Sequence, residues 1–533
     1  MATTAAAVAR ALADRGIERA FGLPGGEVLV LIDELRKAGI DFVLMRHEAN
    51  AGIAAAVYGK LNGQPGVVIA TLGPGAANLL LPVANAYLDQ EPLLAITAQI
   101  PDDFPPSHTH QLLPLHDTYR PMCKMVEKVT STNAPDTVRL ALDSCMQRPY
   151  GVSYLTLSAR EATKPLTAGA HSPNGHSRDA VMQRADPRSA AMAIGARLSK
   201  AERPLVLVGL SVDQRHAPRL REWLTRWNLP VAVTPKVKGI VDETAPNFLG
   251  VISGMAADGL MVEALEAADL LIGFGLDPVE VDKTWHAELP IDWVLESPNV
   301  AGRVPDGVRL IDHATLLDAL VAAGPPRPWQ ASFKPFQDRR RALLSGDAAD
   351  RAVMWPGDLI RALSDAVPAE TIVTTDVGSH KYLFGQFWPS RHPETFWMSN
   401  GLSGMAYGLS AAIGAKLARP AAPVLAAVGD GGFSMNAQEL ETAERVGAPF
   451  ITVVLEDGSY SLIKLAQENR RLEPYRMDFR PIDTVKMAEA CGVEAVRTSD
   501  PDQLAGAVKR AVEKNQSLVA AVPVHYADYR KLF

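Results

Sequence analysis

Residues 424–460 read VLAAVGDGGFSMNAQELETAERVGAPFITVVLEDGSY, and this stretch decides the fold of the chain around it. An apolar run ends at Gly429, an amphipathic helical pattern covers residues 439–446, and a second apolar run over residues 450–455 ends just before Asp457. Continuous apolar runs are typical of strands buried on both faces, as in parallel sheets flanked by helices. The stretch therefore predicts a strand–helix–strand crossover in an α/β protein, with ligands bound at the carboxyl ends of its strands.

Two carboxylates fall at the tips of these strands. Asp430 follows the first strand and Asp457 follows the second, so the crossover brings them to adjacent strand ends. Gly431 and Gly432 come directly after Asp430 and let backbone N–H groups approach an anion. Oxygen ligands of this kind suit Mg²⁺, which offsets the charge of a diphosphate. The pattern predicts a magnesium diphosphate site, and a pair of solvated strand-end acids beside a helix cap is the alternative interpretation.

The same unit of apolar run and helical pattern recurs along the chain, and two stretches rich in Pro, Gly and polar residues interrupt it, at 163–187 and 324–355. Interruptions of this composition are typical of linkers. We therefore expect an α/β protein with three doubly wound parallel-sheet domains, over residues 1–165, 185–325 and 355–533.

Composition restricts the class of protein. The 533 residues include 53 Lys plus Arg and 60 Asp plus Glu, a net charge of −7 that argues against a nucleic acid or an anionic membrane as partner. Three cysteines cannot form a disulfide framework, and no apolar stretch reaches the ~20 residues needed to cross a bilayer. The first residues predict an amphipathic helix, not a secretory signal. We expect a cytoplasmic protein.

Several catalytic motifs are missing from the sequence. There is no phosphate-binding GxxxxGK[ST] loop, Ala51 stands where HExxH needs its second histidine, and Met405 stands where a nucleophile elbow needs glycine. The chain offers no obvious nucleophile, which suggests that a cofactor carries the chemistry.

The motif Gly429-Asp430-Gly431, with a second ligand position at Asp457, resembles the thiamine-diphosphate motif, which usually ends in Asn-Asn where this chain has Glu456-Asp457. Further segments are similar to the acetolactate synthase group. In the pyrimidine-binding domain (1–165) these are FGLPGG (21–26), RHE (46–48), TLGPGAAN (71–78) and ITAQ (96–99), and in the diphosphate-binding domain (355–533) they are GLSGMAYGLSAAIG (401–414) and 430–460.

The central Rossmann-like domain (185–325) contains GLDPVEVDKTW (275–285), which looks like the flavin-free catabolic acetolactate synthases. The flavin-bearing biosynthetic enzymes are similar but have Arg in place of Leu276 and a Trp in the region aligned with Ala466. The resemblance thus implies thiamine diphosphate and Mg²⁺ as cofactors, and no FAD.

The resemblance also implies roles for single residues. Glu48 would hydrogen-bond N1′ of the aminopyrimidine, although an ordinary helix-start acid is the alternative. Met405 would be the wedge that keeps the cofactor bent, although core filler is the usual role of such a residue. The metal ligands would be Asp430, Asp457 and the carbonyl of Ser459. The remaining cofactor contacts would be Gly25, Pro74, Asn78, Gly378, Ser379, His380, the carbonyl of Ser403, Gly431, Gly432, Tyr460, Ser461 and Leu462.

On the substrate side, His110 and Gln111 match a pair that points toward the substrate carbonyl, and Lys238 is a candidate substrate-side charge. A solvated loop histidine is the alternative for His110. The family places Glu48 and Asp430 on different subunits, which implies a homodimer as the minimal active unit and a homotetramer as the full assembly.

The implied reaction is decarboxylation of a 2-oxo acid, with pyruvate as the expected donor, followed by carboligation to a second carbonyl compound. With pyruvate in both roles the product would be 2-acetolactate. Two other enzymes share the cofactor residues: a simple 2-oxo-acid decarboxylase, and a transferase like the carboxyethyl-arginine synthases, which share DFVLMRHE (41–48) and Thr109-His110-Gln111. A non-catalytic cofactor-binding relative and a flavin oxidase are further alternatives, and the intact set of Glu48, Asp430 and Asp457 argues against the former.

Overall fold

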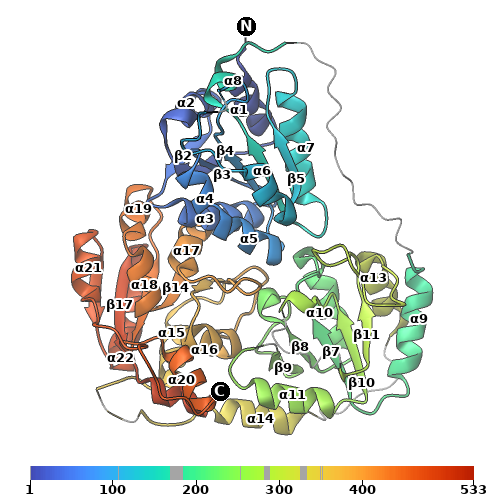
Figure 1. Ribbon diagram of the computed structural model, residues 1–533. Helices are drawn as coiled ribbons and strands as arrows, with labels where there is room; N and C mark the ends of the chain where they lie inside the picture. The colour runs from blue at the N-terminus through green and yellow to red at the C-terminus, as the bar shows by residue number, and fades with distance from the viewer. Residues whose placement is uncertain are drawn as a thin grey trace. The chain divides into compact units, whose positions relative to one another are not determined.

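The computed structural model describes residues 2–105, 107–167, 184–252, 254–280, 288–324, 333–348, 350 and 352–532. The chain divides into two compact units. One contains Met1–Arg178, Ile413–Pro420 and Gln438–Ala448, and the other contains Asp179–Ala412, Ala421–Ala437 and Pro449–Phe533. The described residues form three sheets of parallel strands with helices on their faces (Figure 1), so the predicted fold class is confirmed.

The first unit contains a six-stranded sheet in the order β2-β1-β3-β4-β6-β5. Its strands are β1 (Arg19–Leu23), β2 (Asp41–Leu44), β3 (Gly66–Ala70), β4 (Leu93–Thr97), β5 (Cys123–Lys128) and β6 (Val152–Thr156). The helices around it are α1 (Thr4–Asp14), α2 (Leu29–Lys37), α3 (Glu48–Leu61), α4 (Pro74–Asn78), α5 (Leu80–Leu88), α6 (Leu115–Tyr119), α7 (Ala134–Met146), α8 (Ala159–Thr163) and α19 (Glu439–Arg445). The predicted amphipathic amino-terminal helix is confirmed as α1, which buries Val8 and Leu12 and is capped by the Thr3 hydroxyl.

The second unit contains two sheets. The central one has the order β11-β10-β7-β8-β9, with β7 (Pro204–Val208), β8 (Val231–Val233), β9 (Phe248–Val251), β10 (Leu270–Phe274) and β11 (Ile291–Val294). Its helices are α9 (Pro187–Leu198), α10 (Ala217–Arg226), α11 (Asp258–Glu266), α13 (His313–Ala323) and α14 (Lys334–Ala342), with short 3-10 helices η4 (Pro235–Val237) and η5 (Pro278–Glu280).

The other sheet has the order β13-β12-β14-β15-β17-β16. Its strands are β12 (Ile372–Thr375), β13 (Phe396–Met398), β14 (Val424–Gly429), β15 (Ile451–Glu456), β16 (Glu494–Arg497) and β17 (Leu518–Pro523). The helices are α15 (Pro356–Ala366), α16 (Ser379–Phe387), α17 (Tyr407–Ala418, which crosses the unit boundary), α18 (Asp430–Asn436), α20 (Ser461–Asn469), α21 (Thr484–Ala490) and α22 (Pro501–Lys514), followed by η6 (Tyr526–Lys531).

The sheets are buried as the apolar runs predict, because every residue of β3, β4, β7 and β10 is buried. Gly431 and Gly432 lie in the first turn of helix α18, which begins at Asp430, so their N–H groups belong to a helix start. Parts of both predicted linkers and of segment 275–285 lie outside the described residues, and the three domain boundaries stay a prediction. Within the described ranges, no helix is long and apolar enough to cross a membrane.

Candidate functional site

Glu48 is the first residue of helix α3, four positions after the end of β2. Its side chain is buried, and Asn78 Nδ2 donates to its Oε2 at 3.0 Å. Asn78 is the last residue of helix α4, which follows β3. In the sheet, β1 lies between β3 and β2. The fold thus joins two predicted site residues that are 30 positions apart in the sequence.

The other predicted residues of this unit lie at the same edge of the sheet. Gly25 follows β1 and touches Thr71, since a Cβ on Gly25 would lie 2.5 Å from that side chain. Pro74 begins α4. Gln111, in the loop after β4, lies against Gly73, because a Cβ on Gly73 would come within 2.8 Å of its side chain. His110, beside it, is exposed.

The segment that carries Glu48 is held by a buried carboxylate that the sequence did not single out for this role. Glu439, on α19, accepts from the backbone N–H of Arg46 at 3.0 Å and from Asn50 Nδ2 at 2.8 Å. Burial raises its pKa, and its hydrogen bond with Thr442 opposes this increase. These contacts fix the chain on both sides of Glu48.

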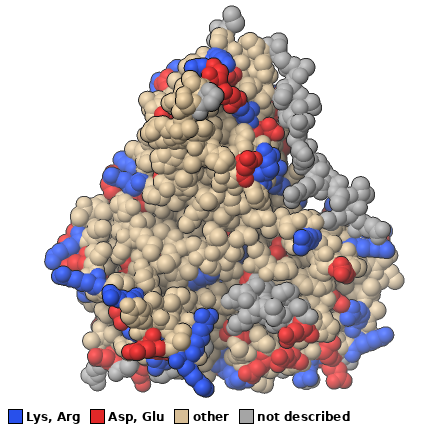
Figure 2. All heavy atoms as spheres, in the orientation of Figure 1, with Lys and Arg blue, Asp and Glu red and all other residues tan. Residues whose placement is uncertain are grey.

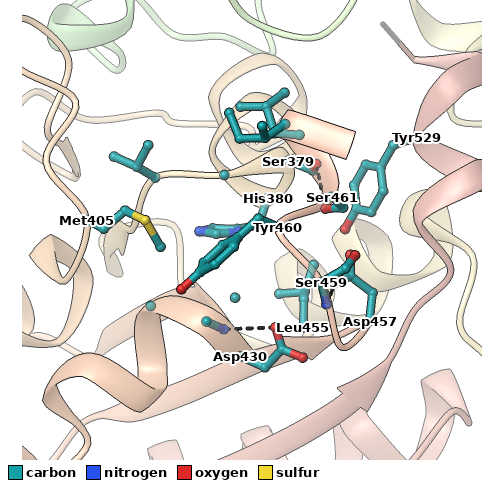
Figure 3. A pocket seen from close by; sticks show the side chains of 17 residues that line it. Ser379, His380, Met405, Asp430, Leu455, Asp457, Ser459, Tyr460, Ser461 and Tyr529 are labelled. Carbon is teal, nitrogen blue, oxygen red and sulfur yellow. Dashed lines mark hydrogen bonds between the residues drawn. The ribbon is translucent and has the colours of Figure 1, made fainter. Parts of the chain in front are cut away.

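A pocket lies in the second unit, at the carboxyl ends of β12, β14 and β15 (Figure 3), with about 590 Å³ of empty space when the open solvent at its mouth is included. It brings together most of the predicted cofactor residues: Gly378, Ser379, His380, Met405, Asp430, Gly431, Gly432, Asp457, Ser459, Tyr460, Ser461 and Leu462. Five further residues line it: Val377, Gly429, Leu455, Ile463 and Tyr529.

Asp430 and Asp457 lie together on one side of this pocket, with Met405 on the opposite side (Figure 3). The Asp430 carboxylate accepts from the N–H groups of Gly431 and Gly458, both at 2.8 Å. Burial raises its pKa to about 6, and the charges of Asp457 and Glu456 add to the increase. Burial also raises the pKa of Asp457, which accepts from the Ser459 N–H at 3.0 Å. Two neighbouring acids whose pKa values are raised in this way favour a bound cation.

Glu456, the neighbour that replaces the usual Asn, forms an ion pair of its own. It accepts from both Nη atoms of Arg497 on strand β16, one of them at 3.1 Å. Among the causes that raise the pKa of Asp430, the charge of Glu456 comes last, after burial and the charge of Asp457.

Two helices begin at the wall of the same pocket. Helices α16 and α20 begin at Ser379 and Ser461, and the two hydroxyls are 3.0 Å apart. Helix N-termini favour anions because their first N–H groups have no partner within the helix. Burial lowers the pKa of His380 to about 3, so its imidazole is neutral, and among the described residues its buried Nε2 has no hydrogen-bond partner.

The residues of this pocket fit a diphosphate with a divalent cation. The helix starts and the Nε2 of His380 are available to an anion, while Asp430 and Asp457 favour a cation beside it. No group of three or more His, Cys, Asp or Glu side chains that could hold a metal lies within the described ranges. Two carboxylates are nevertheless enough for Mg²⁺, which takes its other ligands from phosphate and water.

Ser403 does not line the pocket. Its side chain is exposed, with its hydroxyl bonded to Lys381 and to the carbonyl of Asn400. Lys238 is a wrong prediction. It is fully buried, its Nζ donating to Glu243 at 2.5 Å and to the carbonyl of Trp388 at 3.0 Å, so it has no access to a substrate.

Tyr529 is a lining residue that the sequence did not reveal. It lies in η6, near the end of the chain and more than 60 residues after the nearest predicted site residue, where no motif marks it. Burial raises its pKa, and the charges of Asp457 and Asp430 contribute.

Family models agree with this site and define the class of protein. The N-terminal thiamine pyrophosphate binding domain matches residues 2–118, the central domain of these enzymes matches 192–295, and the C-terminal binding domain matches 376–522. The chain is therefore a thiamine pyrophosphate enzyme.

Similar proteins indicate which family of thiamine pyrophosphate enzymes the chain belongs to. The chain is 29% identical to an acetolactate synthase of Bacillus subtilis over 97% of its own length and 92% of the relative's. It is 30% identical to the large subunit of acetolactate synthase isozyme 2 of Escherichia coli (94% and 92%) and 27% identical to a catabolic acetolactate synthase of Raoultella terrigena (96% and 93%). The chain belongs to the acetolactate synthase family, and it is an enzyme that decarboxylates a 2-oxo acid and ligates the product to a second carbonyl compound. The matches favour this reaction over the decarboxylase and carboxyethyl-arginine synthase alternatives.

Proposed function

We propose that this enzyme uses thiamine diphosphate and Mg²⁺ to convert two molecules of pyruvate into 2-acetolactate and CO₂. The observation that carries the proposal is the pocket in which Asp430 and Asp457, both with raised pKa, face the starts of α16 and α20. The choice of pyruvate and of acetolactate rests on the names of the relatives.

Bound thiamine diphosphate supplies the carbanion that attacks the 2-oxo group and the electron sink that allows CO₂ to leave. Glu48 holds and moves the proton at N1′ of the aminopyrimidine, for which a buried carboxylate is suited. Asn78 keeps that carboxylate oriented through its 3.0 Å hydrogen bond. Gly25, which follows β1, and Pro74, the first residue of α4, line the ring.

At the other end, Asp430, Asp457 and the carbonyl of Ser459 hold Mg²⁺. The diphosphate lies against the residues at the starts of α16 and α20, which are Gly378, Ser379, His380, Tyr460, Ser461 and Leu462, and against Gly431 and Gly432 of α18. Met405 supports the bent cofactor from the opposite side of the pocket (Figure 3). The Ser403 carbonyl, two residues before Met405, stays a predicted acceptor for the exocyclic amine, because Ser403 does not itself line the pocket.

On the substrate side, Gln111 donates to the substrate's carboxylate or to the developing oxyanion. Its position against Gly73, next to Pro74, supports this role. His110 is the second substrate-side group.

The central sheet supports the prediction that no FAD binds. A nucleotide in such a sheet lies at the switch point, here between β7 and β10. The loops that follow these strands bond to each other there, with the Ser211 N–H donating to the Gly275 carbonyl at 2.9 Å. The buried carboxylate of Glu280 accepts from the N–H groups of Leu210 at 2.8 Å and Lys236 at 3.0 Å, so these donors are not available to a nucleotide phosphate.

We propose a homodimer as the minimal active unit and a homotetramer as the assembly, with Glu48 of one subunit serving the pocket of its partner. Exposed apolar side chains beside each half of the site support a covering second copy. Leu80 and Leu81 follow Asn78 closely, and Ile463 lines the pocket; all three are more than one-third exposed. Activity that persists in a monodisperse monomer after dilution would contradict this assembly.

We place the enzyme in the cytoplasm, with small molecules as its other partners. Three free cysteines, two of them partly exposed, suit a reducing compartment. On the face shown in Figure 2, acidic and basic side chains are interspersed among uncharged ones, which gives no support for binding nucleic acid or an anionic membrane.

The test is an incubation of the purified chain with thiamine diphosphate, MgCl₂ and pyruvate, with products identified by mass spectrometry. We expect acetolactate and CO₂, with loss of turnover after metal removal by a chelator and recovery on adding Mg²⁺. Acetaldehyde as the only organic product would show a simple decarboxylase. A product formed only with another acceptor, such as an amine substrate, would show a different transferase.

A further inference from the structure

Ala406, the residue after Met405, has an unusual backbone conformation. Its φ is +64°, in the left-handed region that glycine adopts readily and that disfavours alanine because of its Cβ. Such a conformation persists where the surroundings impose it, and it is often found at functional sites. The neighbouring contacts show what imposes it here.

The N–H of Ala406 is held by Asp376, which follows β12. Asp376 Oδ2 accepts from this N–H at 3.0 Å, and Oδ1 accepts from the N–H groups of Tyr407 at 3.3 Å and Val377 at 2.7 Å. The side chain is 1% exposed. Burial raises its pKa to about 6, so it is mostly ionised at neutral pH and able to accept all three hydrogen bonds.

The carbonyl of Ala406 is held from another element. Asn436, the last residue of α18 and also 1% exposed, donates from Nδ2 to this carbonyl at 2.8 Å. Both polar backbone groups of Ala406 therefore bind buried side chains, one from the end of β12 and one from α18.

The carboxylate has little freedom to move. A Cβ on Gly432 would lie 2.3 Å from Asp376 Oδ2, so α18 approaches the carboxylate as closely as a glycine allows. The contact with Asp376 therefore explains why position 432 requires a glycine, independently of any contact that Gly432 makes with the cofactor.

We propose that Asp376 and Asn436 are positioning residues that hold Ala406 in its left-handed conformation and so direct Met405 into the cofactor pocket. The proposal rests on the proposed function, in which Met405 supports the bent cofactor. If Ala406 relaxed to an ordinary conformation, the chain would turn at this residue and carry Met405 away from its place in the wall.

The experiment compares Asp376→Asn and Asn436→Ala with the wild type and with a matched control, Asp365→Asn, which changes an exposed carboxylate on α15. Hydrogen exchange of the Ala406 and Tyr407 amides is first measured in the cofactor-free chain. A hydrogen bond to a charged group contributes enough to slow exchange by about 10- to 100-fold, so we expect Asp376→Asn to accelerate exchange by this factor and the control to leave it unchanged.

Cofactor affinity and turnover are measured next. Calorimetric titration with thiamine diphosphate and MgCl₂ should give a nearly unchanged affinity, because the diphosphate seat is intact. The kcat should fall by about 100-fold, the size of effect expected from a misplacement of about 1 Å. A merely structural role would lower stability and leave kcat of the folded fraction unchanged, and that result would overturn the proposal.

Ala406→Gly gives an independent test, which also applies if Asp376→Asn does not fold. Glycine adopts the left-handed conformation without the steric penalty, so the conformation depends less on the two side chains. In the Ala406→Gly background, the losses caused by Asn436→Ala or Asp376→Asn should shrink by about 5- to 30-fold, and equal losses in both backgrounds would refute the proposal. A wild type that binds no thiamine diphosphate would instead overturn the proposed function, while the exchange data would still test the hold on Ala406.

Discussion

Acidification should weaken Mg²⁺ binding in the pH range just below neutral. A carboxylate must lose its proton to bind the metal, so each acid with a raised pKa makes affinity rise with pH until that acid is ionised. The pKa of Asp430 is raised from 3.8 to about 6, chiefly by burial. For this pKa, the ionised fraction is about ten-elevenths at pH 7 and about one-eleventh at pH 5.

Asp430 alone therefore predicts a loss of affinity of about tenfold between pH 7 and pH 5, with a plateau above pH 7. The pKa of Asp457 is raised in the same direction, so the full effect should exceed tenfold. Binding should release protons below pH 7, and this release is measurable by calorimetry in buffers of different ionisation enthalpy.

The assay is a calorimetric titration of MgCl₂ into the protein saturated with thiamine diphosphate, at pH 5.5, 6.5, 7.5 and 8.5. A titration of MgCl₂ into thiamine diphosphate alone corrects for ionisation of the diphosphate. Asp430→Asn should bind Mg²⁺ more weakly and with a smaller dependence on pH. An affinity that is constant from pH 5.5 to 7.5, or the same pH dependence in Asp430→Asn, would refute the assignment of Asp430 as a ligand.

Three further variants test other parts of the structure. Glu48→Gln should slow hydrogen–deuterium exchange at C2 of bound thiamine diphosphate by about 100- to 10,000-fold without a large change in melting temperature, and a wild-type exchange rate by NMR would exclude the role given to Glu48. Arg497→Ala should leave Glu456 unpaired and raise the pKa of Asp430, so the plateau of Mg²⁺ affinity should move to higher pH; an unmoved curve would mean that the ion pair is irrelevant to the metal. Glu280 has a pKa raised from 4.5 to about 7 by burial, so the folded state holds its proton more tightly than the unfolded chain and stability falls as pH rises between these values, by about 3 kcal/mol. Glu280→Gln should flatten the pH dependence of denaturant unfolding in this range, and an unchanged curve would contradict the raised pKa.

The strand-end residues of the site could be predicted because apolar runs mark buried parallel strands and their ligands lie at the carboxyl ends. Asp430 and Asp457 follow such runs, and the structure places each at a strand end. Glu48 follows β2, an edge strand of which only Val43 is buried. Asp376 also follows an apolar run, but the sequence gives no sign that it binds the N–H of a residue 30 positions away.

Residues whose role depends on a distant partner could not be assigned in this way. The sequence predicts Lys238 as a substrate-side charge because it shows a lysine and not its surroundings. A buried ammonium is expensive unless it is paired and hydrogen-bonded, and here Glu243 and the carbonyl of Trp388, 150 residues away, meet that need. Burial lowers the pKa of Lys238 and raises that of Glu243, while each group opposes the shift of the other.

Glu456 is a second residue whose partner the sequence does not reveal. From the sequence, an acid next to Asp457 is expected to weaken metal binding, since neighbouring like charges raise each other's pKa. The strand order resolves the conflict: β17 lies between β15 and β16, with Glu456 opposite Pro523 on one side and Arg497 opposite Ala521 on the other. Only two positions separate Pro523 and Ala521 along β17, so Arg497 reaches across that strand to Glu456. Strand β16 precedes β17 in the sequence but lies beyond it in the sheet, so no local sequence pattern identifies Arg497 as the partner of Glu456. The fold alone brings Arg497 to Glu456, and this ion pair allows an acid to stand next to Asp457.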